Sequence, residues 1–236
     1  MKARKYILPI VLICCCLYLC YFFRYQLLNF YYQFQNESTQ EGIIDFAYWK
    51  SRNPDVYAWI RIEGTNIDYP ILQSADDTED GYYLTHDIDR ESNIYGAIYT
   101  EKINSKDFTN PNTVIYGHNM IDDSMFGSLG EYINEDYFSN HNTIVIYTPN
   151  EKREYEIVAA YEYPETHILS AFDFTTEEGT NQYIQQIPEF VSNTGGILKA
   201  DAERKAPLLT LSTCTPNDVG MRFLVQGVLT EVEVMK

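Results

Sequence analysis

The chain has 236 residues, of which 45% are hydrophobic and 15% aromatic, and its formal net charge is −17 at pH 7. This content supports one sizeable domain or at most two small ones. Every acidic side chain lies after residue 36, so the long C-terminal part would repel nucleic acid and anionic lipid headgroups, and neither is expected as a ligand.

The N-terminus contains a long uncharged stretch, YILPIVLICCCLYLCYFF, at residues 6–23. As a helix it would be ~27 Å long, close to the ~30 Å hydrocarbon core of a bilayer. The flank RYQLLNFYYQFQNE has no small-residue cleavage site, which favours an uncleaved anchor over a signal peptide. The basic MKARK predicts a single-pass cell-membrane protein with a cytoplasmic N-terminus and an extracellular C-terminal domain. The predicted segments are a basic tail at 1–5, a transmembrane anchor at 6–23, a juxtamembrane stalk at 24–41 and the extracellular domain at 42–236.

Strand-like patterns dominate the remainder and predict a mainly β domain. Period-two alternation over residues 56–73 surrounds a Gly-Thr-Asn turn, which is typical of two neighbouring strands. Clusters of Gly, Pro, Asn and Asp separate the later candidates. So many short strands at close spacing indicate a barrel or a sandwich. The later strand candidates are 96–101, 112–118, 142–149, 153–163, 206–214 and 222–234.

Helices are predicted at three places among these strands. A helical apolar stripe over 41–55 ends at Asn53-Pro54. A second helical stretch covers 124–140. A third covers 175–196, with Thr175 or Thr176 as its N-cap and Gly195-Gly196 at its end.

Cysteine usage singles out one thiol. Four of the five cysteines lie within residues 6–23, so Cys214 is alone in the rest of the chain. It cannot form a structural disulfide within the extracellular domain. It is therefore buried and inert, part of an intermolecular bridge, or reactive.

The local pattern around Cys214 favours a reactive thiol. In PLLTLSTC, strand alternation places Ser212 and Cys214 on one face, which becomes polar towards its end. The turn-rich TPNDVGM follows, and a strand resumes at Arg222. Such a turn would fold Arg222 back beside Cys214 across an antiparallel pair. A neighbouring cation favours a thiolate.

A cysteine nucleophile usually needs a base, and His118 is the best candidate. It ends the β-rich run NTVIYGHNM, so it too lies at a strand end, after a glycine that allows close approach. His86, His141 and His167 are expected to be surface or core residues. Metal-binding, nucleotide-binding and serine-hydrolase motifs are absent from the sequence.

Together these segments resemble the sortases, and class B in particular. TLSTC with a strand-leading Arg222 and an upstream YGHNM carries the resemblance, which covers roughly residues 42–232. NPDVYAWIRIEGTNIDYPILQ resembles the N-terminal part of the class B domain. The resemblance implies an eight-stranded β-barrel with N-terminal helices and a long helix, here 175–196, between the sixth and seventh strands.

The resemblance also implies a function, a membrane-anchored cysteine transpeptidase outside a Gram-positive membrane. Such an enzyme cuts a C-terminal sorting signal of the N/S-P-x-T-G/N/S kind after its threonine and holds the acyl group as a thioester. It then transfers the surface protein to an amine of the cell-wall precursor or cross-bridge. The implied partners are that surface protein, the wall amine and, through the N-terminal helix, the membrane. No cofactor or metal is implied.

Site residues follow from the same resemblance. Cys214 would be the nucleophile, His118 the general acid/base, and Arg222 the residue that holds the substrate or stabilises the oxyanion. Positions that resemble the substrate groove of class B enzymes, and that fit a packing role as well, are Ser212, Leu84, Tyr183 and Ile184.

Two alternatives stay open at this level. One is a thiol peptidase on the same fold, in which water resolves the thioester. The other is a non-catalytic, anchored surface-interaction module in which Cys214 is buried and inert.

Overall fold

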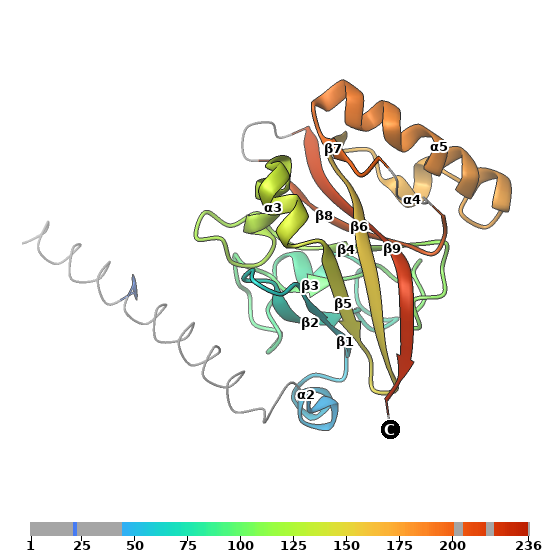
Figure 1. Cartoon of the computed structure of the whole chain (residues 1–236). Helices are drawn as coiled ribbons and strands as arrows, with labels where there is room; N and C mark the ends of the chain where they lie inside the picture. Colours follow the sequence, from blue (N-terminus) through green and yellow to red (C-terminus); the bar gives the residue numbers. More distant parts are fainter. Residues whose placement is uncertain (1–20, 23–43, 201–204, 216–219, 236) are drawn as a thin grey trace, which may run out of the picture. The chain divides into compact units, whose positions relative to one another are not determined.

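A computed structural model describes residues 21–22, 44–200, 205–215 and 220–235. Strands and helices follow one another along the chain from Phe46 onwards (Figure 1). The helices are α2 (Phe46–Arg52), the short 3-10 helix η2 (Tyr82–Leu84), the 3-10 helix η3 (Gly127–Ile133), α3 (Glu135–Asn140), α4 (Ile168–Ala171) and α5 (Glu177–Thr194). The strands are β1 (Val56–Arg61), β2 (Asp68–Leu72), β3 (Ile98–Tyr99), β4 (Asn112–Tyr116), β5 (Thr143–Tyr147), β6 (Glu151–Pro164), β7 (Ile197–Leu198), β8 (Leu208–Cys214) and β9 (Met221–Val234).

Within the described residues, eight strands close into a barrel. Their order is β5-β1-β2-β3-β4-β8-β9-β6, and β6 pairs with β5 to complete the ring. Closure excludes the sandwich and confirms the predicted mainly β, eight-stranded barrel. The additional short strand β7 pairs with β6 at Ala159 and Ala160. The long helix α5 lies between β6 and β7 in the chain, as predicted.

Apolar side chains form two clusters on the two sides of the barrel wall. Leu209 and Leu211 of β8 belong to a cluster shared with strands around the whole barrel. Leu208 of β8 packs instead with α5 residues such as Ile187. Figure 1 shows α5 lying over the part of the barrel that contains β6, β7 and β8. Because β8 is covered on both faces, its sequence LLTL is mostly apolar and does not alternate strictly.

The helices differ from the predicted bounds in two places. The first is shorter than 41–55 and covers Phe46–Arg52. The stretch 124–140 is divided into η3 and α3, because Asn134 has an extended backbone and its side chain accepts hydrogen bonds from the first amides of α3. The third confirms the prediction: the Thr176 side chain accepts from Gly179 N, and Gly195 ends α5 with φ +68°.

The predicted localisation, a single-pass membrane protein, is contradicted by the described part of the chain. No helix among the described residues is long and apolar enough to cross a bilayer. Apart from Tyr21 and Phe22, the predicted span at 6–23 lies outside the described residues, as do the predicted tail at 1–5 and stalk at 24–41.

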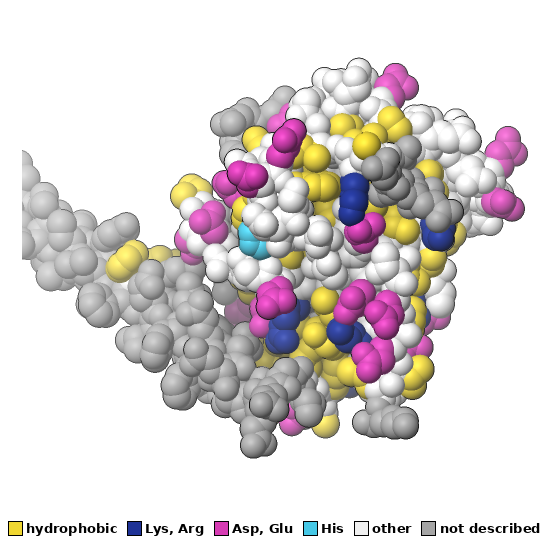
Figure 2. Space-filling view, in the orientation of Figure 1, with side chains coloured by type: hydrophobic (Ala, Val, Ile, Leu, Met, Phe, Trp, Pro, Cys, Tyr) yellow, Lys and Arg dark blue, Asp and Glu magenta, His cyan; other side chains and the backbone are white. Residues whose placement is uncertain are grey.

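Acidic side chains are spread over the face shown in Figure 2. Several basic side chains of the domain are paired with acids, as in Lys152–Glu154 at 2.6 Å and Lys199–Glu156 at 2.5 Å. The formal charge of −17 already counts these paired cations, so the pairs neutralise charge locally and leave the domain acidic as a whole.

A buried polar network joins α5 to the barrel wall. Gln226 of β9 is fully buried, and its Nε2 donates to Tyr183 Oη of α5 at 2.5 Å and to Thr210 Oγ1 of β8 at 3.0 Å. Tyr161 Oη donates to the Gln226 carbonyl at 3.0 Å. Burial raises the pKa of both tyrosines, so both hydroxyls stay neutral. One amide therefore satisfies groups from β6, β8 and α5.

We predict that Gln226→Leu lowers the free energy of unfolding by about 1–3 kcal/mol, because three buried hydroxyls lose a partner. Urea or thermal unfolding measures the change. Thr230→Ala, an exposed substitution on the same strand, is the control and should stay within about 0.5 kcal/mol of the unmodified chain. Unchanged stability of Gln226→Leu would show that the network does not hold α5.

Candidate active site

Cys214 is the last residue of β8, and its side chain is exposed although the six residues before it are buried. β8 pairs with β9 in antiparallel register, and Cys214 lies directly opposite Arg222. This is the pairing that the sequence pattern predicted. The strand end therefore places a thiol and a guanidinium side by side at the rim of the barrel.

His118 reaches the same rim because β4 runs parallel to β8. In that pair Tyr116 lies beside Ser212, so the two strands end at the same edge of the sheet. Thr213 Oγ1 donates to Gly117 O at 2.8 Å, and Asn119 Nδ2 donates to Cys214 O at 2.7 Å. These bonds hold the segment that carries His118 against the end of β8.

Gly117 is required for this close approach. A Cβ at this position would lie 2.5 Å from Ile98 Cδ1 and 2.8 Å from Phe126 Cδ2, distances that real Cβ atoms do not show. With a larger residue here, the Ile98 side chain, the Phe126 ring or the His118 segment would have to shift. The glycine before the histidine thus fits the close packing at this point.

A groove of about 390 Å³ contains these residues. It brings together Cys214, His118 and Arg222 with two of the predicted groove residues, Ser212 and Leu84. Its walls combine apolar and polar side chains. The other lining residues are Tyr99, Val114, Tyr116, Gly117, Tyr163, Glu165, Thr166, His167, Ile168, Thr213 and Leu224.

Tyr183 and Ile184, the other two predicted groove residues, are not among the lining residues. Tyr183 is 0% exposed and bonds to Gln226, and Ile184 is 8% exposed in the cluster beneath α5. The apolar stripe of α5 covers the barrel instead. Part of the groove wall is formed by residues between Tyr163 and Ile168, which lead from the end of β6 into the start of α4.

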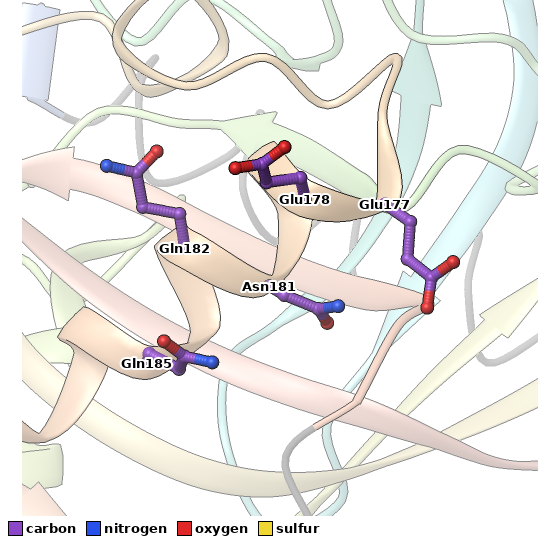
Figure 3. A pocket seen from close by; sticks show the side chains of 5 residues that line it. All are labelled: Glu177, Glu178, Asn181, Gln182 and Gln185. Carbon is purple, nitrogen blue, oxygen red and sulfur yellow. The ribbon is translucent and has the colours of Figure 1, made fainter.

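A second pocket lies on the outer side of α5 and does not share the chemistry of the groove. Figure 3 shows its side chains projecting from the first turns of the helix. All are exposed carboxylates or amides, and none is a nucleophile: Glu177, Glu178, Asn181, Gln182 and Gln185.

Two of the three predicted catalytic side chains have defined hydrogen-bond partners. Arg222 Nη2 forms an ion pair with Glu165, and Nη1 donates to Met221 O at 3.1 Å. His118 Nε2 lies 2.6 Å from Leu84 O. The bond recorded for this imidazole is thus to a backbone carbonyl and not to the thiol.

A polar cluster in the groove was missed by the sequence reasoning. His167 Nε2 lies 2.5 Å from Glu101 Oε2, and the same oxygen lies 3.5 Å from Tyr116 Oη. Burial, followed by the Glu101 carboxylate, raises the pKa of Tyr116 and of Tyr99, so both phenols stay protonated. No local motif marks this cluster, because its members come from distant segments.

Metal binding finds no support in the described residues. No group of three or more His, Cys, Asp or Glu side chains among them is arranged to hold a metal ion. The pair formed by His167 and Glu101 falls short of the three or four protein ligands that a zinc site needs.

Known proteins are similar to this chain in sequence and in architecture. A family model described as Sortase domain matches residues 60–230. Sortase B of Listeria monocytogenes is 35% identical over 179 residues, which is 75% of this chain and 70% of that protein.

Solved structures of sortase B have a similar fold. Sortase B from B. anthracis, solved in complex with AAEK1, has a TM-score of 0.65 at 30% identity and covers 79% of this chain and 84% of that chain. Staphylococcus aureus sortase B has a TM-score of 0.71 at 24% identity, covering 89% and 98% respectively, and supports the fold alone. With its closed barrel and the matched residues 60–230, the chain belongs to the sortase family and to class B within it.

Proposed function

We propose that this chain is a cysteine transpeptidase that cleaves a C-terminal sorting signal of the N/S-P-x-T-G/N/S type after its threonine. It then transfers the acyl group to a cell-wall amine. The observation that carries the proposal is the placement of Cys214, which is exposed, opposite Arg222 and in one groove with His118. Membership of the sortase family supports the reaction class.

In the proposed reaction, the Cys214 sulfur attacks the carbonyl carbon of the threonine while its proton passes to His118. The C–N bond breaks, the leaving amine takes a proton from His118, and the acyl group stays on sulfur as a thioester. The acceptor amine then attacks the thioester and loses a proton to His118. The Cys214 sulfur departs and takes this proton back from His118, so the enzyme returns to its starting thiol and neutral imidazole.

Arg222 is proposed to stabilise the oxyanion or to hold the substrate carbonyls. Its guanidinium has five N–H donors in a planar fork, more than its contacts with Glu165 and Met221 require. Charge-assisted bonds from such a fork are stronger than neutral ones. The developing negative charge on the threonine carbonyl oxygen is the group that gains most from them.

The groove suits an extended peptide. Protonated phenols of Tyr99 and Tyr116 and apolar atoms of Leu84 line it beside Ser212. Neutral hydroxyls can bond peptide groups without repelling a carboxylate, and the aromatic faces can bury a proline ring. The proposed partners are therefore surface proteins with a sorting signal and a wall amine.

The two alternative functions, a non-catalytic module and a thiol peptidase, differ in how well they fit the structure. The non-catalytic module requires a buried thiol, and this is wrong because Cys214 is exposed. Hydrolysis remains a competitor, because an exposed thioester is open to water. The identity of the acceptor is decided by product analysis.

We predict that mass spectrometry of the protein with a panel of N/S-P-x-T-G/N/S peptides detects an acyl adduct on Cys214. Triglycine should remove the adduct and appear in the product. The variant Cys214→Ala should form neither adduct nor product. Hydrolysis products alone would favour the thiol peptidase, and cleavage by Cys214→Ala would disprove the assignment.

Alkylation gives a test that needs no substrate. Cys214 should react with iodoacetamide in the native protein, because its side chain is exposed at the groove. Peptide mapping separates this site from the N-terminal cysteines. A native protein whose Cys214 resists the reagent until denaturant is added would contradict the accessible thiol.

Removing the other two groups should reduce turnover without unfolding the domain. His118→Ala and Arg222→Ala should each lower kcat/KM by about 100-fold or more, with little change in Tm, since both lie at the groove surface. Arg61→Ala, which breaks a remote pair with Asp68, is the matched control and should retain activity. Near-normal rates for either groove variant would remove its proposed role.

A further inference from the structure

We propose that the backbone carbonyl of Leu84 is the positioning group of His118, that it selects the Nε2–H tautomer, and that Gly96 preserves the space this carbonyl occupies. The inference deepens the proposed function and rests on it, because it explains how the general acid/base of that groove is oriented.

The tautomer follows from the chemistry of the acceptor. His118 Nε2 lies 2.6 Å from Leu84 O. A carbonyl oxygen has no proton to donate, so the hydrogen of this bond must be on Nε2. In the neutral ring Nδ1 is then unprotonated and is the basic nitrogen. Nδ1 makes no hydrogen bond within the described part of the chain, which leaves it for the thiol or the leaving amine.

The carbonyl is available because it ends the 3-10 helix η2. The other two carbonyls of η2 accept from backbone amides: Tyr82 O from Thr85 N at 3.3 Å, and Tyr83 O from Ala97 N at 2.8 Å. The last carbonyls of a helix lack partners within it. Leu84 O finds its partner in His118, from a segment that is distant in the sequence.

Gly96 lies directly against this helix end. Its φ is +57°, a conformation that favours glycine. A Cβ at this position would lie 2.5 Å from Tyr83 O and 2.7 Å from Leu84 O. Both obstacles are backbone atoms, so a side chain at position 96 would have to displace the carbonyl that orients His118.

This arrangement gives the proton a defined route. During attack the S–H bond of Cys214 breaks and an N–H bond forms at Nδ1, and the same proton later passes to the leaving amine. Nε2–H stays on Leu84 O throughout. The neutral carbonyl thus does the orienting that a carboxylate does in a Ser-His-Asp triad, and no carboxylate contacts His118 among the described residues.

The first test uses two alanine variants at opposite ends of the same segment. Gly96→Ala should lower kcat by about tenfold or more with KM changed by less than about twofold, because the ring is misplaced but the groove remains. Gly81→Ala is the matched control: Gly81 precedes η2 with φ −82°, and a Cβ there meets no atom within 4 Å. Gly81→Ala should keep the normal rate. Equal rates for the two variants would overturn the role of Gly96.

The second test reads the tautomer directly and does not require turnover. In the Cys214→Ala chain labelled with 15N-histidine, the 15N–1H correlation pattern of His118 at a pH where the ring is neutral should be that of Nε2–H. The His118→Gln variant assigns the signal. An Nδ1–H pattern would overturn the inference even if Gly96→Ala failed to fold. Absence of any acyl adduct in the unmodified chain would instead refute the proposed function and leave the tautomer result standing.

Discussion

The site depends on a single strand, β8, that pairs with neighbours of opposite direction. Its parallel pairing with β4 brings the two strand ends to the same rim, which places His118 near Cys214. Its antiparallel pairing with β9 places Arg222 opposite the same thiol. A shift of one residue in either register would turn Cys214 to the other face of the wall, so the apolar packing that sets the register also sets the chemistry.

That packing is strong because the wall around β8 is covered on both sides. Leu209 and Leu211 face the barrel cluster, while Leu208 and the underside of α5 form the second cluster. The buried amide of Gln226 links the two through its bonds to Tyr183 and Thr210. A wall held from both sides moves little, and the proposed catalytic groups at its edge would need that rigidity.

The groove also contains polar partners that fix the orientation of three of its side chains. Glu165 holds the Arg222 guanidinium, and the Leu84 carbonyl holds the His118 ring. Glu101 does the same for His167 at 2.5 Å. In each case the partner comes from a loop or a helix end, since such segments leave unpaired polar groups that a strand interior would not.

The sequence by itself determined the strand pattern, the approximate bounds of α5 and the pairing of Cys214 with Arg222, because alternation, caps and turns are local signals. Those signals left a barrel and a sandwich open, and closure of the sheet decided for the barrel. Tertiary structure decided the rest. Tyr183 is an example: its position in the helix fits a groove residue and a core residue equally well. Packing of α5 against the barrel, where Tyr183 bonds to Gln226, is what buries it. Contacts between distant segments, such as His118 with Leu84, depend on loop geometry that no local pattern encodes, so only the folded chain could reveal them.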